Sequence, residues 1–273
     1  MTELTAVIDA DVIAYTAAAA AESDSHDIYM NRYVALPSEV NVAVTLHAAK
    51  RIADTMLAQW VTKAGADTLI LAFSGPSSSN FRRGVHKLYK SNRTGEKPAC
   101  YVELVAALQA VYPWVAYDCL EGDDVLGMAV TDPSTHDDHI AVSTDKDILT
   151  LPGKLCHIRK DGTCDMYDRQ EQHADWYWMK QTIMGDSTDG YKGAPGIGEK
   201  GATARLGTLK SLRAMWDVVI EAYKEQHLKP AQKKKFVTTS PYQEALMNAR
   251  CARILRHGDF NHETGEVKLW VPA

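Results

Sequence analysis

The chain has 273 residues, of which 45% are hydrophobic and 24% charged, and its formal net charge is −5 at pH 7. This length suits one large domain or a domain with an added lobe, and no apolar run approaches the roughly 20 residues that a membrane helix needs. The start lacks a signal-peptide pattern and the five scattered cysteines form no CxxC pair, which argues against zinc or disulfide frameworks and for a reducing cytoplasm.

Strands and helices alternate in the predicted first part of the chain. Strand-length apolar runs occur at 4–9, 68–73, 114–117 and 140–143, and helical patterns at 38–65, 99–112 and 123–130. This alternation predicts an α/β fold with a mainly parallel central sheet flanked by helices.

A hairpin is expected over 154–168, because Asp161–Gly162 is a good type I′ turn pair. From residue 170 onward the pattern becomes helical. We therefore expect one α/β domain at 1–169 and a helical lobe at 170–273. The stretches 24–37 and 226–241 are expected to be the least structured connections.

Carboxylates gather where the predicted strands end. Asp9, Glu121 and Asp145 each closely follow a strand, and ligands in parallel sheets collect at the carboxyl ends of strands. All-oxygen sites suit Mg²⁺ or Mn²⁺, and two such ions are the usual arrangement for in-line phosphodiester cleavage. The acids form four clusters: Asp9 with Asp11; Glu121, Asp123 and Asp124; Asp145 and Asp147; Asp186 and Asp189.

Each acid alone also has a structural explanation. Asp9 could cap a helix, an adjacent pair such as Asp123–Asp124 is often solvated, and Asp11 is interpreted as structural or exposed. The ordered set at strand ends favours a metal site.

A glycine-rich turn follows the last acids. Gly193, Gly196 and Gly198 precede a predicted helix that opens near Glu199 and carries Lys200. Glycine lets a backbone approach a phosphate closely, and a helix N-terminus offers free N–H groups to an anion. The alternative is an ordinary surface loop.

A basic segment lies at 81–98 in this acidic chain. Phe81 and Tyr89 could stack on bases, and the lysines and arginines could contact phosphates. Lysines at 229–235 and three arginines after Pro241 are explained equally well by solvation. The basic residues of the two regions are Arg82, Arg83, Lys87, Lys90, Arg93 and Lys97, then Arg250, Arg253 and Arg256.

The ordered motifs resemble the flap endonuclease and 5′–3′ exonuclease family, in particular its bacteriophage members. The resemblance covers roughly 6–207 and rests on LEGDD, STDKD, MGDSTDG followed by GAPGIGEKGA, and FRR…YKSNR. It implies a PIN-like 5′ nuclease core, a helical arch at about 74–98, and a helix–hairpin–helix (helix–three-turn–helix) element at about 184–206. That element would bind duplex DNA, with K⁺ as a candidate ion at its turn.

The same resemblance implies residue roles. Lys90 and Arg93 would contact the scissile phosphate. Two Mg²⁺ ions, for which Mn²⁺ can substitute, would be held by Asp9, Glu121, Asp123, Asp145, Asp147, Asp186 and Asp189, with Asp124 in support. DNA would be bound by Arg82, Arg83, Lys87, Tyr89, Gly196, Gly198 and Lys200.

One departure concerns the end of the second strand. Many members have an aspartate there, whereas this chain has Ser74, a poor direct ligand.

The expected function is Mg²⁺-dependent 5′–3′ exodeoxyribonuclease or 5′-flap endonuclease action on double-stranded, 5′-ended or flapped DNA. Phage-type replication, recombination or host-DNA degradation would use it. We expect a cytoplasmic protein without a membrane partner, and a monomer by default. The alternatives are a PIN-type ribonuclease, a haloacid-dehalogenase-type phosphatase with Asp9 as nucleophile, and a DNA-structure-binding protein that has lost turnover.

Overall fold

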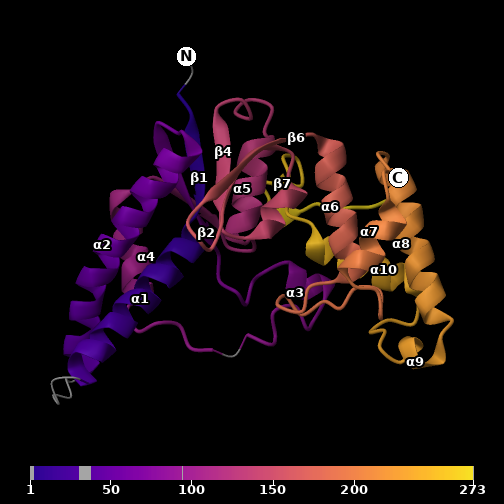
Figure 1. Cartoon of the computed structure of the whole chain (residues 1–273), viewed down its shortest axis with the longest axis horizontal. Helices are drawn as coiled ribbons and strands as arrows, with labels where there is room; N and C mark the ends of the chain where they lie inside the picture. The colour runs from indigo at the N-terminus through magenta and orange to yellow at the C-terminus, as the bar shows by residue number, and fades with distance from the viewer. Residues whose placement is uncertain (1–2, 31–37, 94, 273) are drawn as a thin grey trace.

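A six-stranded sheet forms the centre of the molecule (Figure 1). The computed structural model describes residues 3–30, 38–93 and 95–272, with side chains except those of 24–30 and 38–41. The strand order is β3-β2-β1-β4-β5-β6; the first five strands are parallel and β6 is antiparallel to β5. The strands are β1 Thr5–Asp9, β2 Thr68–Ser74, β3 Trp114–Tyr117, β4 His139–Ser143, β5 Gly153–Ile158 and β6 Cys164–Arg169. The α/β fold with a mainly parallel sheet is confirmed.

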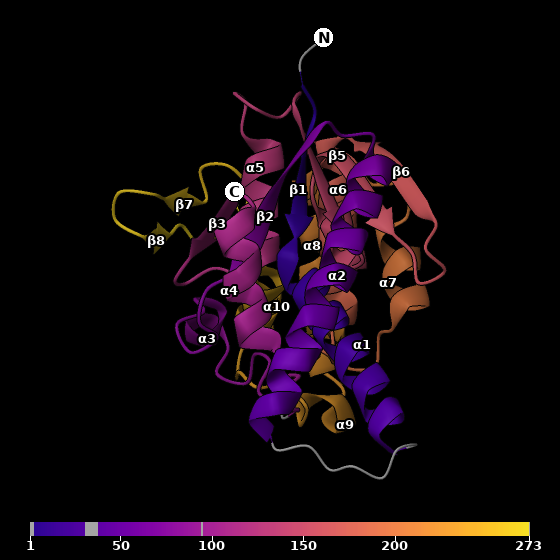
Figure 2. The same ribbon diagram turned by 90° about the vertical axis from the view of Figure 1, so that its left-hand side faces the viewer.

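Alternate residues of β1 enter different cores, as the two-residue period of a strand requires. Ala6 and Ile8 pack with α1, α2 and α4 on one face, whereas Val7 packs with α5 and the 3₁₀ helix η1 on the other. Figure 2 looks onto the α1, α2 and α4 layer. These elements are α1 Ala10–Met30, α2 Ser38–Ala64, α4 Tyr101–Val111, α5 Gly122–Thr131 and η1 Lys146–Thr150.

The chain after β6 is mainly helical, as expected from residue 170 onward. A separate core forms around Trp178 and Tyr223, and it includes Tyr89 from the first half of the chain. Its elements are α6 Glu171–Met184, α7 Glu199–Leu206, α8 Leu212–His227, α9 Pro230–Lys233 and α10 Pro241–Ala252, followed by the hairpin β7 Phe260–Asn261 and β8 Glu266–Val267. Among the helices of the described ranges, none is long and apolar enough to cross a membrane.

The turn between β5 and β6 differs from the expected type I′ turn. That type needs positive φ at both central residues, but only Gly162 of the pair Asp161–Gly162 has it (φ 80°). The Gly162 N–H donates to the Arg159 carbonyl at 2.9 Å, so Lys160 and Asp161 are the central residues. Gly162 supplies the left-handed position that follows such a turn.

The segment at 74–98 is not a helical arch. Among its described residues the only helix is α3, Arg82–Val85, which has four residues. Tyr89 is buried in the C-terminal core, and the Lys90 N–H donates to the Asp189 carbonyl at 2.8 Å. These contacts fold the segment onto the chain after α6.

The expected connection at 24–37 is helical as far as Met30, where α1 ends; 31–37 lie outside the described residues. Similarly, 226–241 contains the end of α8 and all of α9. The division into domains at 169/170 stays a prediction. Ile254, after α10, belongs to the core beside α5, so the chain returns to the sheet at its end.

Candidate active site

Carboxylates gather at the carboxyl edge of the sheet, on either side of β1. Asp9 is the last residue of β1, and Asp145 follows β4 and caps η1. The chain goes from β1 outward to β2 and β3, then crosses to β4 on the other side of β1. Ligands of α/β proteins bind at such a switch of strand order. Glu121, after β3, caps α5 in a reciprocal capping box with Asp124.

Asp9, Asp123 and Asp145 form a first group of acids. The Ser143 hydroxyl donates to Asp9 Oδ2 at 2.8 Å and accepts the Asp145 N–H at 3.0 Å, so one side chain orients both acids. Burial, then the charge of Asp11, raises the pKa of Asp9 to about 7. Burial, then the charges of Asp9 and Asp145, raises the pKa of Asp123 well above its ordinary value.

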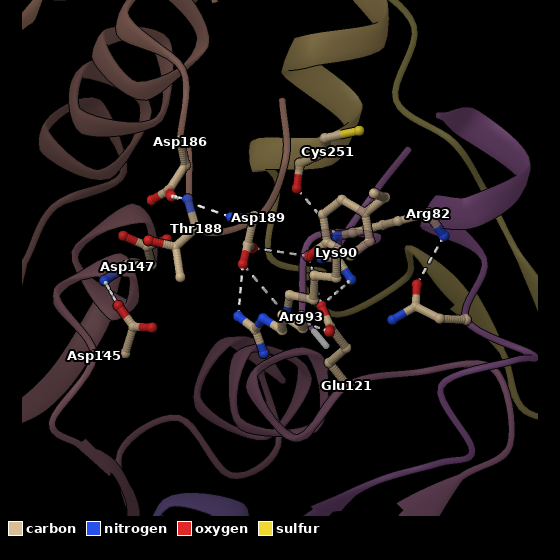
Figure 3. Close-up of polar contacts among 12 residues, drawn as sticks. Arg82, Lys90, Arg93, Glu121, Asp145, Asp147, Asp186, Thr188, Asp189 and Cys251 are labelled. Atoms are coloured by element: carbon tan, nitrogen blue, oxygen red, sulfur yellow. Dashed lines mark hydrogen bonds and ion pairs between the residues drawn. The ribbon is translucent and has the colours of Figure 1, made fainter. Parts of the chain in front are cut away.

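Asp147, Asp186 and Asp189 form a second group (Figure 3). Burial, then the charges of Asp145, Asp186 and Asp189, raises the pKa of Asp147 to about 7. Gln181 Nε2 donates to Asp147 Oδ1 at 2.5 Å. Asp186 Oδ1 accepts the N–H groups of Thr188 and Asp189 at 2.7 and 3.3 Å, which shapes the loop between the two acids.

Two basic side chains, Lys90 and Arg93, pair with Glu121 and with Asp189 of the second group. Lys90 Nζ donates to Glu121 and lies 3.7 Å from Asp189 Oδ1, and Arg93 donates to the same Asp189 oxygen at 2.8 Å. The Tyr89 hydroxyl lies 2.8 Å from Glu121 Oε2 and 3.0 Å from Asp189 Oδ2. Burial raises the pKa of Glu121, but the charges of Lys90 and then Arg82 outweigh it and lower the pKa to about 2.

These side chains suit a hard divalent cation. Asp123 Oδ1 is buried and has no hydrogen-bond partner in the described part of the chain, and the donors are oxygens, as Mg²⁺ and Mn²⁺ prefer. Mutual repulsion among close acids also falls when a cation binds. Within the described ranges, however, no three His, Cys, Asp or Glu residues are arranged as a ready coordination cluster.

Comparison with known proteins identifies the family. An exodeoxyribonuclease of Enterobacteria phage T3 is 31% identical over 301 residues, which cover 97% of this chain and 92% of that protein. An exonuclease of Escherichia phage T7 is 30% identical over 295 residues, covering 97% and 93%. The chain belongs to the phage-type 5′ nuclease family.

Two further comparisons bear on the nuclease. No protein-family model matches the chain. The T5 D15 protein, crystallised with metal ions, has a TM-score of 0.59 and 14% identity, covering 90% of this chain and 87% of that one. This likeness supports the fold. The phage relatives show that the chain is a nuclease. Its α/β architecture is the one described above.

Three expected roles in the nuclease need correction. Arg82 is 2% exposed and forms a bidentate ion pair with Asp124 at 2.7 Å for each bond, so it cannot reach DNA in this conformation. Asp124 also accepts the N–H groups of Glu121 and Leu255 at 3.1 and 3.0 Å. Its oxygens are thus engaged within the protein rather than free for a metal. Tyr89 is buried, with its hydroxyl on the acids, and its ring cannot stack on a base.

The other expected DNA contacts are accessible to different degrees. Lys87, Gly196, Gly198 and Lys200 are exposed, and Arg83 is half-buried. The arginines near the end of α10 are structural: Arg250 Nε donates to the Trp270 carbonyl at 3.0 Å, and Arg253 and Arg256 pair with Asp259 and Asp175 at 2.7 and 2.8 Å.

Hydrogen bonds of its buried residues hold the glycine turn in place. The Gly193 N–H donates to Asn248 Oδ1 at 3.1 Å, and the Ala194 N–H donates to the Ile183 carbonyl at 2.7 Å. Gly196 has φ 87°, whereas Gly198 has φ −92° and caps α7. The backbone of the turn is therefore fixed by these bonds, while Gly196 and Gly198 are exposed to solvent.

Sequence reasoning missed two polar side chains that orient acids, Ser143 and Gln181, and considered Ser74 only as a poor metal ligand. Ser143 stands within the STDKD motif, and its place at the end of β4 was the available signal. Gln181 lies inside α6, where nothing local distinguishes it. The Ser74 hydroxyl accepts the Gly122 N–H at 2.9 Å and its own N–H donates to Asp11 Oδ2 at 2.8 Å, so Ser74 joins β2 to α5 and leaves Asp11 with the structural role expected for it.

Proposed function

We propose that this nuclease is a Mg²⁺-dependent 5′–3′ exodeoxyribonuclease that also cuts 5′ flaps. The observation that carries the proposal is the set of acids at the switch between β1 and β4, with the buried Asp123 Oδ1 that has no hydrogen-bond partner among the described residues. The phage T3 relative is named an exodeoxyribonuclease, which supports DNA as the substrate. A role in phage-type replication, recombination or host-DNA degradation is compatible with this activity.

The carboxylates would hold two divalent ions. Bound divalent ions lower the pKa of water and stabilise negative charge on phosphoryl oxygens. The proposed ligands are the acids of the two groups and Glu121: Asp9, Asp123, Asp145, Asp147, Asp186, Asp189 and Glu121. Asp124 acts instead as a positioning residue, because it fixes the N-terminus of α5 through its bond to the Glu121 N–H.

Lys90 and Arg93 would bind the scissile phosphate. Their present partners are Glu121 and Asp189, which are proposed metal ligands. Divalent ions that take over these acids would free both cations for a phosphate. The site would thus exchange internal ion pairs for metal and DNA.

The turn at 184–206 would act as the helix–hairpin–helix element that binds duplex DNA. It connects α6 to α7 and exposes Gly196, Gly198 and Lys200. Free N–H groups at the start of α7 would face a backbone phosphate. K⁺ at this turn is a further part of the proposal.

The test uses a 5′-flap duplex labelled separately at each end. It is incubated with Mg²⁺, with EDTA, and with Mg²⁺ and Asp145→Asn or Asp123→Asn protein. We expect short 5′ products only with metal and wild-type protein, a loss of at least about 100-fold in rate in either variant, and retained DNA binding. Product length separates trimming from flap cutting.

Asp217→Asn is the matched control, since Asp217 is an exposed aspartate on α8; it should cut like wild type. Full activity of Asp145→Asn would refute the site assignment. Cleavage of single-stranded RNA in preference to DNA would favour the ribonuclease alternative. Binding without cutting under Mg²⁺ or Mn²⁺ would favour a DNA-structure-binding protein.

A further inference from the structure

The lysine-rich segment, defined as 229–235, presents positive charge that the proposed function does not use. Its lysines are exposed, and it contains no acid. In the described part of the chain none of the four forms an ion pair, although Lys229 Nζ donates to Gln226 Oε1 at 3.3 Å. The charge of Lys229 acts on Glu225 nearby, whereas Lys233, Lys234 and Lys235 have no ion-pair partner among the described residues. Such exposed positive charge in a chain of net charge −5 favours an anionic partner. The lysines are Lys229, Lys233, Lys234 and Lys235.

The residues after these lysines are anchored to the lobe. The buried Glu244 carboxylate accepts the N–H groups of Val237 and Thr238, at 3.1 and 2.7 Å. The Phe236 ring packs edge-on against Tyr223, with 6.1 Å between ring centroids. The lysine-rich segment is therefore held in a defined place on the surface, which lowers the ordering cost of a contact.

The segment adjoins the glycine turn. A Cβ built on Gly196 would lie 3.1 Å from Gln232 Nε2, so α9 packs against this turn. Lys200 lies just beyond, at the start of α7, and the neighbouring Glu199 is neutralised by Lys180 at 3.0 Å. Two basic stretches far apart in sequence thus meet. In Figure 1, α9 lies on the same side of the molecule as α3, the side toward which β1 runs.

We infer that the lysine-rich segment binds backbone phosphates of double-stranded DNA next to the glycine turn. The inference rests on the proposed function and adds to it a contact that the 184–206 element alone does not provide. Lysines at phosphates supply affinity without reading sequence. Single-strand sites also need exposed aromatic rings for base stacking, and the one aromatic residue next to the lysines, Phe236, packs inward. Duplex is the better fit.

The test compares two variants that each lose three positive charges. One carries Lys233→Gln, Lys234→Gln and Lys235→Gln; the control carries Lys50→Gln, Arg51→Gln and Lys268→Gln, which are exposed on α2 and beside the β7–β8 hairpin. Binding of a labelled duplex of about 20 base pairs is measured by fluorescence anisotropy in EDTA over a range of salt concentrations.

Affinity falls as salt rises, and each lost phosphate contact should reduce the magnitude of the slope of log affinity against log salt by about 0.9. The lysine variant should therefore bind more weakly than wild type, and the magnitude of its slope should be smaller by roughly 1 to 3. The control variant should match wild type in both affinity and slope. Equal slopes and affinities in all three proteins, or equal weakening in both variants, would overturn the inference. Cutting by wild-type protein is scored separately, and its absence would count against the proposed function while leaving the binding comparison valid.

Discussion

At the scale of single residues, Arg82 joins three parts of the chain. Its guanidinium pairs with Asp124 on α5, and it donates to the carbonyls of Cys251 and Arg253 at 3.1 and 2.6 Å. These bonds tie the segment before Lys90 and the end of α10 to the helix that follows Glu121. An arginine in a basic sequence segment is thus a structural hub.

Arg82→Met should destabilise the protein by about 3–5 kcal/mol, because it leaves the fully buried Asp124 carboxylate without its counter-ion. Urea unfolding followed by circular dichroism measures the change. Arg83→Gln is the control and should stay within about 0.5 kcal/mol of wild type. A loss no larger than that of the control would show that Arg82 does not hold Asp124 in place.

At the scale of elements, the loop between α6 and α7 combines tight and open glycines. A Cβ on Gly193 would lie 2.4 Å from the Gly185 nitrogen and 2.5 Å from the Ile183 carbonyl oxygen, and its φ is 65°. Around Gly198 a Cβ would meet nothing within 4 Å. Position 193 therefore requires glycine, whereas position 198 permits a side chain.

Gly193→Ala should lower the free energy of unfolding by about 2–4 kcal/mol, since both the backbone conformation and the close approach oppose a methyl group. Gly198→Ala should change it by less than about 1 kcal/mol. Thermal unfolding of the two variants side by side measures the difference. If both variants melt together with wild type, the loop is not packed as described.

At the scale of the whole molecule, the acids of the site oppose folding until cations neutralise them. Burial first, and the charges of neighbouring carboxylates second, raise the pKa values of Asp9, Asp123 and Asp147. Lys90 and Arg93, from the segment between β2 and α4, pair with Glu121 and Asp189, and the charge of Lys90 offsets only part of the raised pKa of Asp123. Stability and function therefore compete at this edge of the sheet.

Mg²⁺ should stabilise the wild-type protein by about 2.7 kcal/mol at a concentration 100 times its Kd, and EDTA should reverse the effect. Asp123→Asn should be at least as stable as wild type without metal, because it removes a carboxyl group whose ionisation burial and neighbouring acids oppose, and should gain less from Mg²⁺. Denaturant unfolding with and without Mg²⁺ measures both. An equal gain in Asp123→Asn would show that metal binds elsewhere.

Local patterns were sufficient to predict the six strands of the central sheet, most helices and the placement of Asp9, Glu121 and Asp145 after strand ends, but not the β7–β8 hairpin. Apolar periodicity determines which elements form, and the direction of parallel strands determines where their ends lie. The prediction of a type I′ turn was wrong because Asp161 and Gly162 are not the two central residues of the turn between β5 and β6.

Only the tertiary structure decided what the basic segment does. Arg82, Tyr89 and Lys90 lie in one basic stretch for which the sequence predicts DNA contacts, yet Arg82 and Tyr89 are buried while Lys90 is paired with Glu121. Burial and partner choice depend on contacts with residues 31 to 171 positions away, such as Glu121, Asp189 and Arg253. Most elements, and the acids that follow the strands, can be read from the amino-acid sequence because they depend on local periodicity. The pairing of charges depends on long-range packing and emerged only with the folded chain.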